Sequence, residues 1–277
     1  MSATPRETYS HGHAESVLRS HRWRTAENSA GYLLSLLRPT DRLLDIGTGP
    51  GTITADFAAR LAAGSVTGLD NAPTAVAETR RLAAERGLRN LTVTEGDVYA
   101  LAYAEGAFDV VHAHQVLQHL ADPVAALREM ARVCAPDGLV AARDADYAAM
   151  TWYPDRPELH RWLQLYQRVA RHNGGEPDAG RRLAGWARAA GFASVTATAS
   201  AWCFADRDDL DWWSGTWADR LLTSSFGEQA VRLGWSDSAE LAGLAEAWRR
   251  WAQAPDAWFA ILHGELICRP ADSGLVT

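Results

Sequence analysis

Cysteines are too few and too widely spaced in this sequence for a disulfide framework or a metal cluster. The 277 residues include three, Cys134, Cys203 and Cys268, with no Cys-x-x-Cys pair among them. Neither a zinc site nor an iron–sulfur cluster is therefore expected, and no metal ligands are assigned. Free thiols in a reducing compartment are the simplest interpretation.

Long apolar runs and an excess of positive charge are also missing. No stretch approaches the ~18 uninterrupted apolar residues of a membrane-spanning helix, and residues 1–13 lack the apolar segment of a secretory signal. We therefore expect a cytoplasmic protein without a membrane partner. The net charge of −7 and the pI of about 5.7 argue against a nucleic-acid partner, because such surfaces usually carry a basic patch.

A glycine-rich stretch, Leu-Leu-Asp-Ile-Gly-Thr-Gly-Pro-Gly-Thr at residues 43–52, organises the first half of the chain. Its apolar beginning indicates a buried strand. Gly47 and Gly49 permit a tight turn and a close approach of a ligand to the backbone. Pro50 suits the first turn of a helix. A strand, a glycine turn and a helix start are typical of the ligand site in a doubly wound α/β sheet.

The spacing of this turn indicates which ligand it binds. Gly-x-Gly-x-Gly is one residue shorter than the Gly-x-Gly-x-x-Gly of dinucleotide sites. Asp45 would repel a pyrophosphate and would suit a cationic ligand that carries an amine. With Gly47, Gly49 and Gly51 it resembles the first motif of the class I methyltransferases that depend on S-adenosylmethionine (SAM). The alternative is a strand-to-helix turn without a ligand.

Two further strands end in acids. Asp70 ends a strand at residues 65–70, where a carboxylate can accept hydrogen bonds from ribose, a group that NAD and SAM share. Asp97 and Val98 end a strand at residues 91–98, and the resemblance implies that they border the adenine. Residues 108–114 match the family's Phe-Asp-hydrophobic-hydrophobic segment. The predicted SAM-binding residues are Asp45, Gly47, Thr48, Gly49, Asp70, Asn71, Asp97, Val98 and His114.

The alternation of strands and helices predicts the fold. Residues 42–146 alternate strands with helices, which favours a parallel sheet. Two later strands, 193–204 and 258–268, complete the fold that the resemblance implies: α/β, with a seven-stranded, doubly wound, mostly parallel sheet, an antiparallel last strand and a helical, Trp-rich cap. The predicted divisions are N-terminal lid helices (1–38), a SAM-binding core (39–146) and the rest of the sheet with cap insertions at about 147–178 and 206–254 (147–277).

Eleven of the twelve tryptophans lie after residue 150. Aromatic residues at helical spacing often pack helices together, but they can also line a pocket for a bulky apolar molecule. We expect both, and hence a hydrophobic small-molecule acceptor. The predicted substrate-binding residues are Tyr9, His11, Gln115, Tyr147, Trp152, Trp213 and Trp217.

The first 146 residues are similar to methyltransferases of ubiquinone and menaquinone biosynthesis and of small-molecule natural products. The resemblance implies transfer of a methyl group, and we favour a hydroxyl or carboxylate oxygen as the acceptor. A hydroxyl benefits from a general base, for which His114 and His13 are the candidates; a carboxylate needs none. The alternatives are a SAM-binding protein without transferase activity and, third, a nicotinamide-dependent oxidoreductase.

Overall fold

The structure is a computed structural model that describes residues 23–271. The predicted site residues Tyr9, His11 and His13, and most of the predicted lid, lie outside the described residues. The helices and strands are α2 (Ala26–Leu34), β1 (Arg42–Ile46), α3 (Thr52–Arg60), β2 (Ser65–Asp70), α4 (Pro73–Glu85), β3 (Leu91–Glu95), β4 (Phe108–His114), η1 (Leu117–His119), α5 (Pro123–Val133), β5 (Cys134–Ala145), η2 (Tyr147–Ala149), β6 (Thr151–Tyr153), α6 (Pro157–His172), η3 (Ala179–Arg182), α7 (Leu183–Ala190), β7 (Ser194–Phe204), α8 (Arg207–Thr223), α9 (Ser225–Arg232), α10 (Ser238–Ala252) and β8 (Trp258–Arg269).

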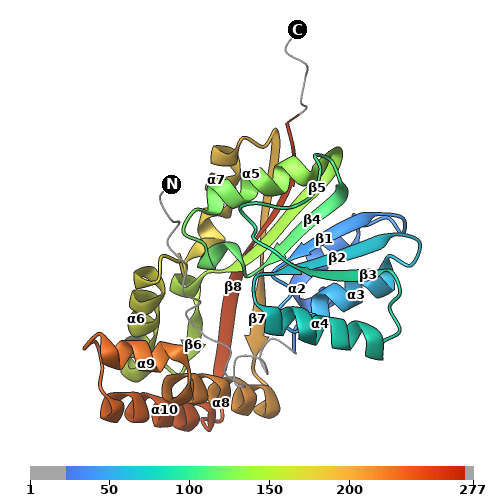
Figure 1. Cartoon of the computed structure of the whole chain (residues 1–277). Coiled ribbons are helices and arrows are strands. Elements are labelled where there is room, and N and C mark those ends of the chain that lie inside the picture. Colours follow the sequence, from blue (N-terminus) through green and yellow to red (C-terminus); the bar gives the residue numbers. More distant parts are fainter. Residues whose placement is uncertain (1–22, 272–277) are drawn as a thin grey trace.

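The described strands form one mixed sheet with the order β3-β2-β1-β4-β5-β8, and both β6 and β7 pair with β8 (Figure 1). Strands β1 to β5 are parallel, and β8 runs antiparallel to β5, β6 and β7. The predicted α/β fold with a reversed last strand is confirmed. The structure adds one short strand to the predicted seven. This strand, β6, shares an edge of β8 with β5, and its three residues are too few to show a periodic pattern.

Both faces of the parallel half are covered, as the apolar runs of its central strands require. Leu43 and Val110 face α2 and α3, whereas Leu44 and Val111 face α5 and α7. The apolar side of α2 packs against α3 and the sheet, so this helix covers part of one face. The predicted N-terminal lid stays a prediction.

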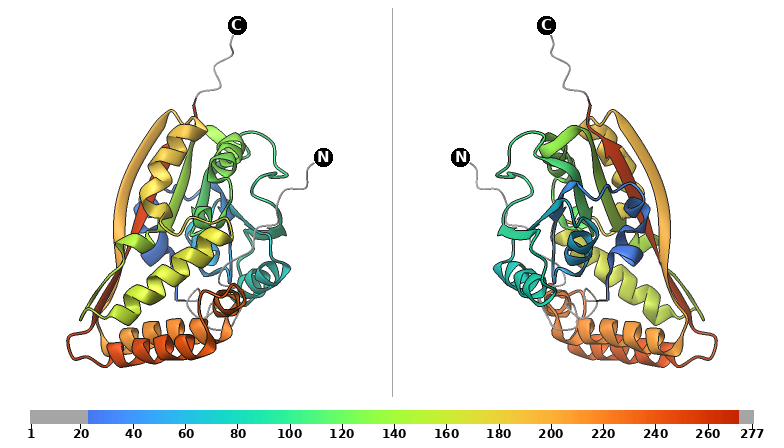
Figure 2. Two further views of the ribbon diagram at one scale, coloured as in Figure 1. Left: turned by 90° about the vertical axis from the view of Figure 1, so that its left-hand side faces the viewer. Right: turned by 90° about the vertical axis from the view of Figure 1, so that its right-hand side faces the viewer.

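The cap consists of α6, α8, α9 and α10, which lie together at one end of the molecule (Figures 1 and 2). Beneath these helices is an aromatic core, here called the cap core, that also includes residues of β7 and β8. Its large buried rings include Trp162, Trp213, Trp217, Trp248, Trp251 and Phe259. Strands β7 and β8 extend from the parallel half to the cap (Figure 1), so one sheet supports both parts. No helix among residues 23–271 is long and apolar enough to cross a lipid bilayer.

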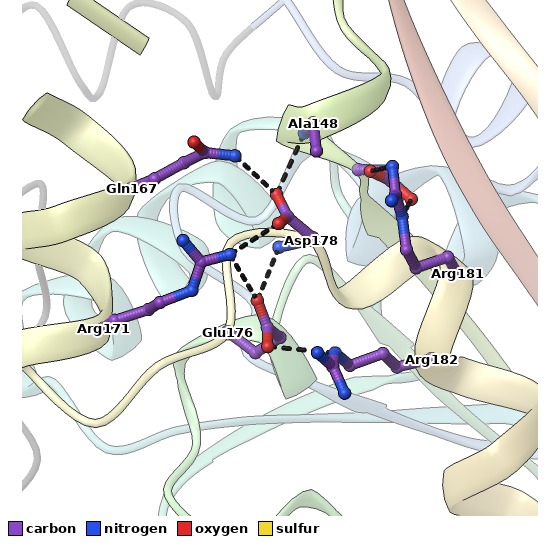
Figure 3. A network of polar contacts seen from close by, with 8 residues as sticks. Ala148, Gln167, Arg171, Glu176, Asp178, Arg181 and Arg182 are labelled. Carbon is purple, nitrogen blue, oxygen red and sulfur yellow. Dashed lines mark hydrogen bonds and ion pairs between the residues drawn. The ribbon is translucent and has the colours of Figure 1, made fainter. Parts of the chain in front are cut away.

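A polar network fastens the segment between α6 and η3 to its surroundings (Figure 3). The largely buried carboxylate of Asp178 accepts hydrogen bonds from the backbone N–H of Ala148 at 2.9 Å, from Gln167 at 2.9 Å and from Arg171 at 2.5 Å. Glu176 accepts from Arg171 and from the backbone of Asp178. One carboxylate therefore links η2, α6 and the connecting segment.

Replacing Asp178 with alanine is expected to lower the free energy of unfolding by about 2 kcal/mol, because it removes the hydrogen-bond acceptor of the Ala148 N–H and of two side chains. Urea unfolding followed by circular dichroism measures the change. Asp155→Ala is the matched control, since the Asp155 carboxylate is 78% exposed and pairs with an exposed histidine; its effect should stay within about 0.5 kcal/mol. Equal stabilities for the two variants would contradict a role for the network.

Candidate functional site

The glycine turn between β1 and α3 has a backbone that other residues adopt poorly. Gly47, Gly49 and Gly51 have φ angles of +74°, +52° and +84°, in the left-handed region that favours glycine. A Cβ on Gly47 would lie 2.4 Å from a methyl group of Val116, and one on Gly51 would lie 2.6 Å from the hydroxyl of Thr79. Both conformation and space therefore require glycine here.

Asp70 lies beside this turn. One of its carboxylate oxygens accepts a hydrogen bond from the backbone N–H of Gly49 at 2.9 Å, and the other accepts from that of Ala72 at 3.0 Å. The side chain is only partly buried. An acid at the end of the second strand can accept hydrogen bonds from ribose hydroxyls, so the structure places Asp70 where a nucleoside at the turn can meet it.

Asp45 lies beneath the turn and is 3% exposed. One oxygen accepts a hydrogen bond from the Thr54 hydroxyl at 2.5 Å, and the other lies 2.7 Å from Nδ1 of the buried His112. Asp45 thus connects β1 to α3 and β4. Its predicted contact with a cationic ligand stays a prediction.

The other predicted SAM-binding residues flank the turn. The Thr48 hydroxyl lies 3.2 Å from that of Thr79, which fixes the turn to α4. Asn71 and Asp97 are exposed, whereas Val98 is buried. The carboxyl ends of the parallel strands β1, β2 and β3 therefore bring the glycine turn, Asp70 and Asp97 to one edge of the sheet.

A further group of mostly polar side chains, here called the polar cluster, lies around His114 at the carboxyl end of β4. His114 is 6% exposed, and its ring lies 5.8 Å from that of Trp202 and 6.3 Å from that of His263. Within the described part of the chain, neither ring nitrogen has a hydrogen-bond partner. Burial lowers the pKa of His114 well below its usual range, and the positive charges of Arg24 and Arg143 lower it further. The imidazole is therefore neutral at pH 7.

This shift in the pKa of His114 should make the protein less stable in mild acid. In the unfolded chain His114 takes up a proton below about pH 6.5, whereas in the folded protein it resists protonation, so stability is lost as the pH falls below 6.5. The contribution of His114 reaches about 1.4 kcal/mol per pH unit. Urea unfolding between pH 8 and 5 should therefore show a flatter dependence for His114→Gln than for wild type. A constant difference between the two proteins at all pH values would contradict this.

The aromatic residues predicted to bind the acceptor lie in or against the cap core. Tyr147 stacks on Tyr166 with ring centroids 4.3 Å apart, and Trp152 stacks on Phe259 at 5.8 Å. Trp213 and Trp217 are 5% and 0% exposed. Ring contacts within the protein therefore surround these side chains, and their contact with an acceptor stays a prediction. Gln115, in contrast, lies in the polar cluster beside His114.

Several members of the polar cluster were missed by the sequence-based prediction. Arg24 precedes α2, Trp202 lies on β7 and His263 lies on β8. These positions are distant in sequence, and no spacing marks them. Asp144 did carry a signal, because it ends a strand as Asp70 does. Burial raises its pKa to about 7, and one of its oxygens accepts from the backbone N–H of Gln118 at 3.2 Å.

The fold and the site's geometry define a class I, Rossmann-like methyltransferase. A family model described as "Methyltransferase domain" matches residues 37–195, and the chain belongs to this family.

Two relatives match nearly the whole chain. An uncharacterized methyltransferase of Schizosaccharomyces pombe is 36% identical over 268 residues, which cover 94% of this chain and 95% of that protein. The probable methyltransferase ltbC of Aspergillus luteorubrus is 27% identical over 281 residues, covering 94% and 96%. Among solved structures, the YcgJ protein of Bacillus subtilis superposes with a TM-score of 0.58 at 18% identity, covering 88% of this chain and 99% of that one. The protein is therefore an SAM-dependent methyltransferase.

The residues at the sheet edge fit SAM. The glycine turn leaves backbone exposed at Gly47, and the carboxylate of Asp70 lies beside it. SAM has no phosphate group that the carboxylates of Asp70 and Asp97 would repel. This combination suits a nucleoside that carries a positive charge.

Proposed function

We propose that the protein transfers the methyl group of SAM to an oxygen atom of a hydrophobic small molecule. The observation that carries the proposal is the position of His114: a neutral, buried imidazole, one strand away from the glycine turn, whose two nitrogens have no hydrogen-bond partner among residues 23–271. A buried polar group without a partner is costly unless a ligand satisfies it. A hydroxyl or carboxylate of the acceptor can supply the missing hydrogen bond.

Two partial similarities support a small-molecule acceptor. The nocamycin O-methyltransferase of Saccharothrix syringae is 35% identical over 136 residues, or 48% of this chain. The ubiquinone/menaquinone biosynthesis C-methyltransferase of Bdellovibrio bacteriovorus is 39% identical over 100 residues. The first supports the proposed O-methylation and the second the proposed ubiquinone/menaquinone-type branch.

In the proposed reaction, bound SAM supplies an electrophilic methyl group for an in-line displacement. The protein positions the acceptor and excludes water. His114 accepts the proton of an acceptor hydroxyl, or donates a hydrogen bond to a carboxylate. Because its pKa is lowered, His114 is a weak base. It therefore suits an acidic hydroxyl, such as a phenol or an enol, better than an aliphatic alcohol.

Single-turnover transfer from methyl-labelled SAM tests the proposal. The acceptors are a panel of aromatic and polyketide-like phenols, carboxylic acids, amines and alcohols, and mass spectrometry locates the label. We expect label on phenol or carboxylate oxygen. His114→Gln should slow transfer to a phenol by about 100-fold when SAM is saturating. Label on carbon or nitrogen, or no transfer by a protein that binds SAM, would overturn the proposal.

A further inference from the structure

His263, on the antiparallel strand β8, is fully buried in the polar cluster and is not part of any sequence motif. Its ring lies 4.3 Å from that of Trp202. Its Nδ1 atom is 3.1 Å from the carbonyl oxygen of Ile261. Because a carbonyl only accepts hydrogen bonds, the proton of the neutral ring is assigned to Nδ1, which leaves a lone pair on Nε2.

This lone pair determines how Gln115 is oriented. The Nε2 atom of His263 lies 2.9 Å from Nε2 of Gln115, so the Gln115 amide donates to the ring. The Gln115 oxygen then points the other way and accepts from Nη2 of Arg24 at 2.6 Å. The opposite amide orientation would set two donors against each other, because a guanidinium has only donors. His263, Gln115 and Arg24 thus form a hydrogen-bond chain with one direction.

The backbone of Gln115 shows that its position is constrained. Its φ of +53° is the only positive value at a residue other than glycine among residues 23–271. Such a conformation costs on the order of 1 kcal/mol and persists where the surroundings hold it. The bond from the N–H of Gln115 to the carbonyl of Arg143, at 2.7 Å, fixes this turn at the end of β4.

Arg24, at the far end of the chain of bonds, lies near the centre of the polar cluster. Its guanidinium is 5.6 Å from the Trp202 ring. Burial is the main cause of the shifted pKa at each of five groups, and the charge of Arg24 is a further cause at all of them: His114, His119, Asp144, Tyr147 and His263. These groups belong to β4, η1, β5, η2 and β8, so the positive charge lies near the place where those elements meet.

Arg143, the other cation of the cluster, is 1% exposed, whereas Arg24 is only partly buried. Arg143 lies 3.4 Å from the Glu265 carboxylate and donates to the hydroxyl of Ser200. The Glu265 carboxylate also accepts from the hydroxyls of Ser200 and Thr198. Arg143 is therefore a structural cation within the protein interior.

We propose that Arg24 binds an anionic oxygen of the methyl acceptor, a carboxylate or an ionised phenol or enol, and that His263 is the positioning residue that holds Arg24 in place through Gln115. This inference rests on the proposed function and names the acceptor's charge. A guanidinium offers donors in a fixed, planar arrangement that matches a carboxylate. His263 touches neither the acceptor nor the donor and acts through the orientation of the Gln115 amide.

Equilibrium binding of two probes tests the proposal: 2-naphthoate and its neutral isostere 2-naphthamide, titrated calorimetrically into the full-length protein saturated with S-adenosylhomocysteine. Wild type should bind naphthoate at least about tenfold more tightly, as one charge-assisted hydrogen bond implies. Arg24→Gln should abolish this preference. Arg128→Gln, a change at an exposed arginine of α5, is the matched control and should keep it.

Variants of His263 separate positioning from structural support. His263→Phe keeps a ring but loses the acceptor for Gln115, so it should reduce the preference for naphthoate to about the level of Arg24→Gln. His263→Gln restores an acceptor oxygen and should regain much of the preference. The affinity of each variant for S-adenosylhomocysteine reports that it is folded.

Three results would overturn the inference: equal affinity of wild type for the two probes, no binding of naphthoate, or a His263→Phe variant that keeps the preference. Because the readout is binding, it is independent of methyl transfer. A protein that prefers naphthoate but methylates carbon or nitrogen would refute only the proposed function.

Discussion

Replacing Asp70 with alanine should weaken the binding of SAM and S-adenosylhomocysteine by at least about 100-fold. A carboxylate that accepts two hydrogen bonds from ribose contributes about 3 kcal/mol, which corresponds to roughly this factor in the dissociation constant. The substitution also removes the bond to the N–H of Gly49 and so loosens the glycine turn. Isothermal titration calorimetry measures both affinities.

The choice of variants shows whether the ribose contact or the general charge is responsible. Asp70→Asn keeps one acceptor oxygen and should fall between wild type and alanine. Glu85→Gln removes an exposed acid of α4 that pairs with Arg81 and should bind both ligands as wild type does. An Asp70→Ala protein with unchanged affinity would show that Asp70 is a turn residue only.

Replacing Trp217 with alanine should lower the free energy of unfolding by about 4 kcal/mol, the usual cost of deleting a large buried ring. Trp217 is fully buried. Its ring centroid lies 4.4 Å from that of Trp162 and 5.4 Å from that of Tyr166. The cavity left behind would separate α6 from α8, since the other rings cannot fill it without leaving their own contacts.

Chemical denaturation measures the free energy of unfolding of Trp217→Ala and of a control variant, Trp258→Ala. The side chain of Trp258 is 38% exposed. Trp258→Ala should cost less than about 1 kcal/mol. The experiment also decides between the two sequence-based interpretations of Trp217, as a core residue or as a pocket residue. A Trp217→Ala protein of normal stability that no longer binds an aromatic acceptor would favour a pocket residue, whereas a large loss of stability favours a core residue.

The parallel half of the sheet could be predicted because its signals are local. Apolar runs such as residues 43–46 are buried on both faces, and glycine and proline mark the turns between strands and helices. The acid at the end of β2 and the glycine turn are adjacent in space because parallel strands end at one edge. The bounds of α6, Pro157–His172, likewise follow local signals, since proline starts the helix and Gly174-Gly175 follows it.

The acceptor side could be predicted only in part, because its residues meet through tertiary packing. The helical spacing of Trp213 and Trp217 indicates a shared face of α8 but does not show whether that face meets a ligand or other rings. Arg24 and His263 are 239 positions apart in the sequence, and Gln115 joins them only because β4, β5 and β8 are neighbouring strands. A histidine inside an apolar strand gives no local sign of such contacts.

Strand β8 also determines when the protein can be completed during synthesis. Within residues 23–271, β7 pairs with no strand except β8, and Phe259 of β8 contributes to the cap core. Strands β1 to β5 can pair as soon as they leave the ribosome, because domains fold from the N-terminal side as the chain emerges. The edge strand and the base of the cap have to wait for residues 258–269. A nascent chain that stops before β8 therefore holds an unpaired, aggregation-prone edge.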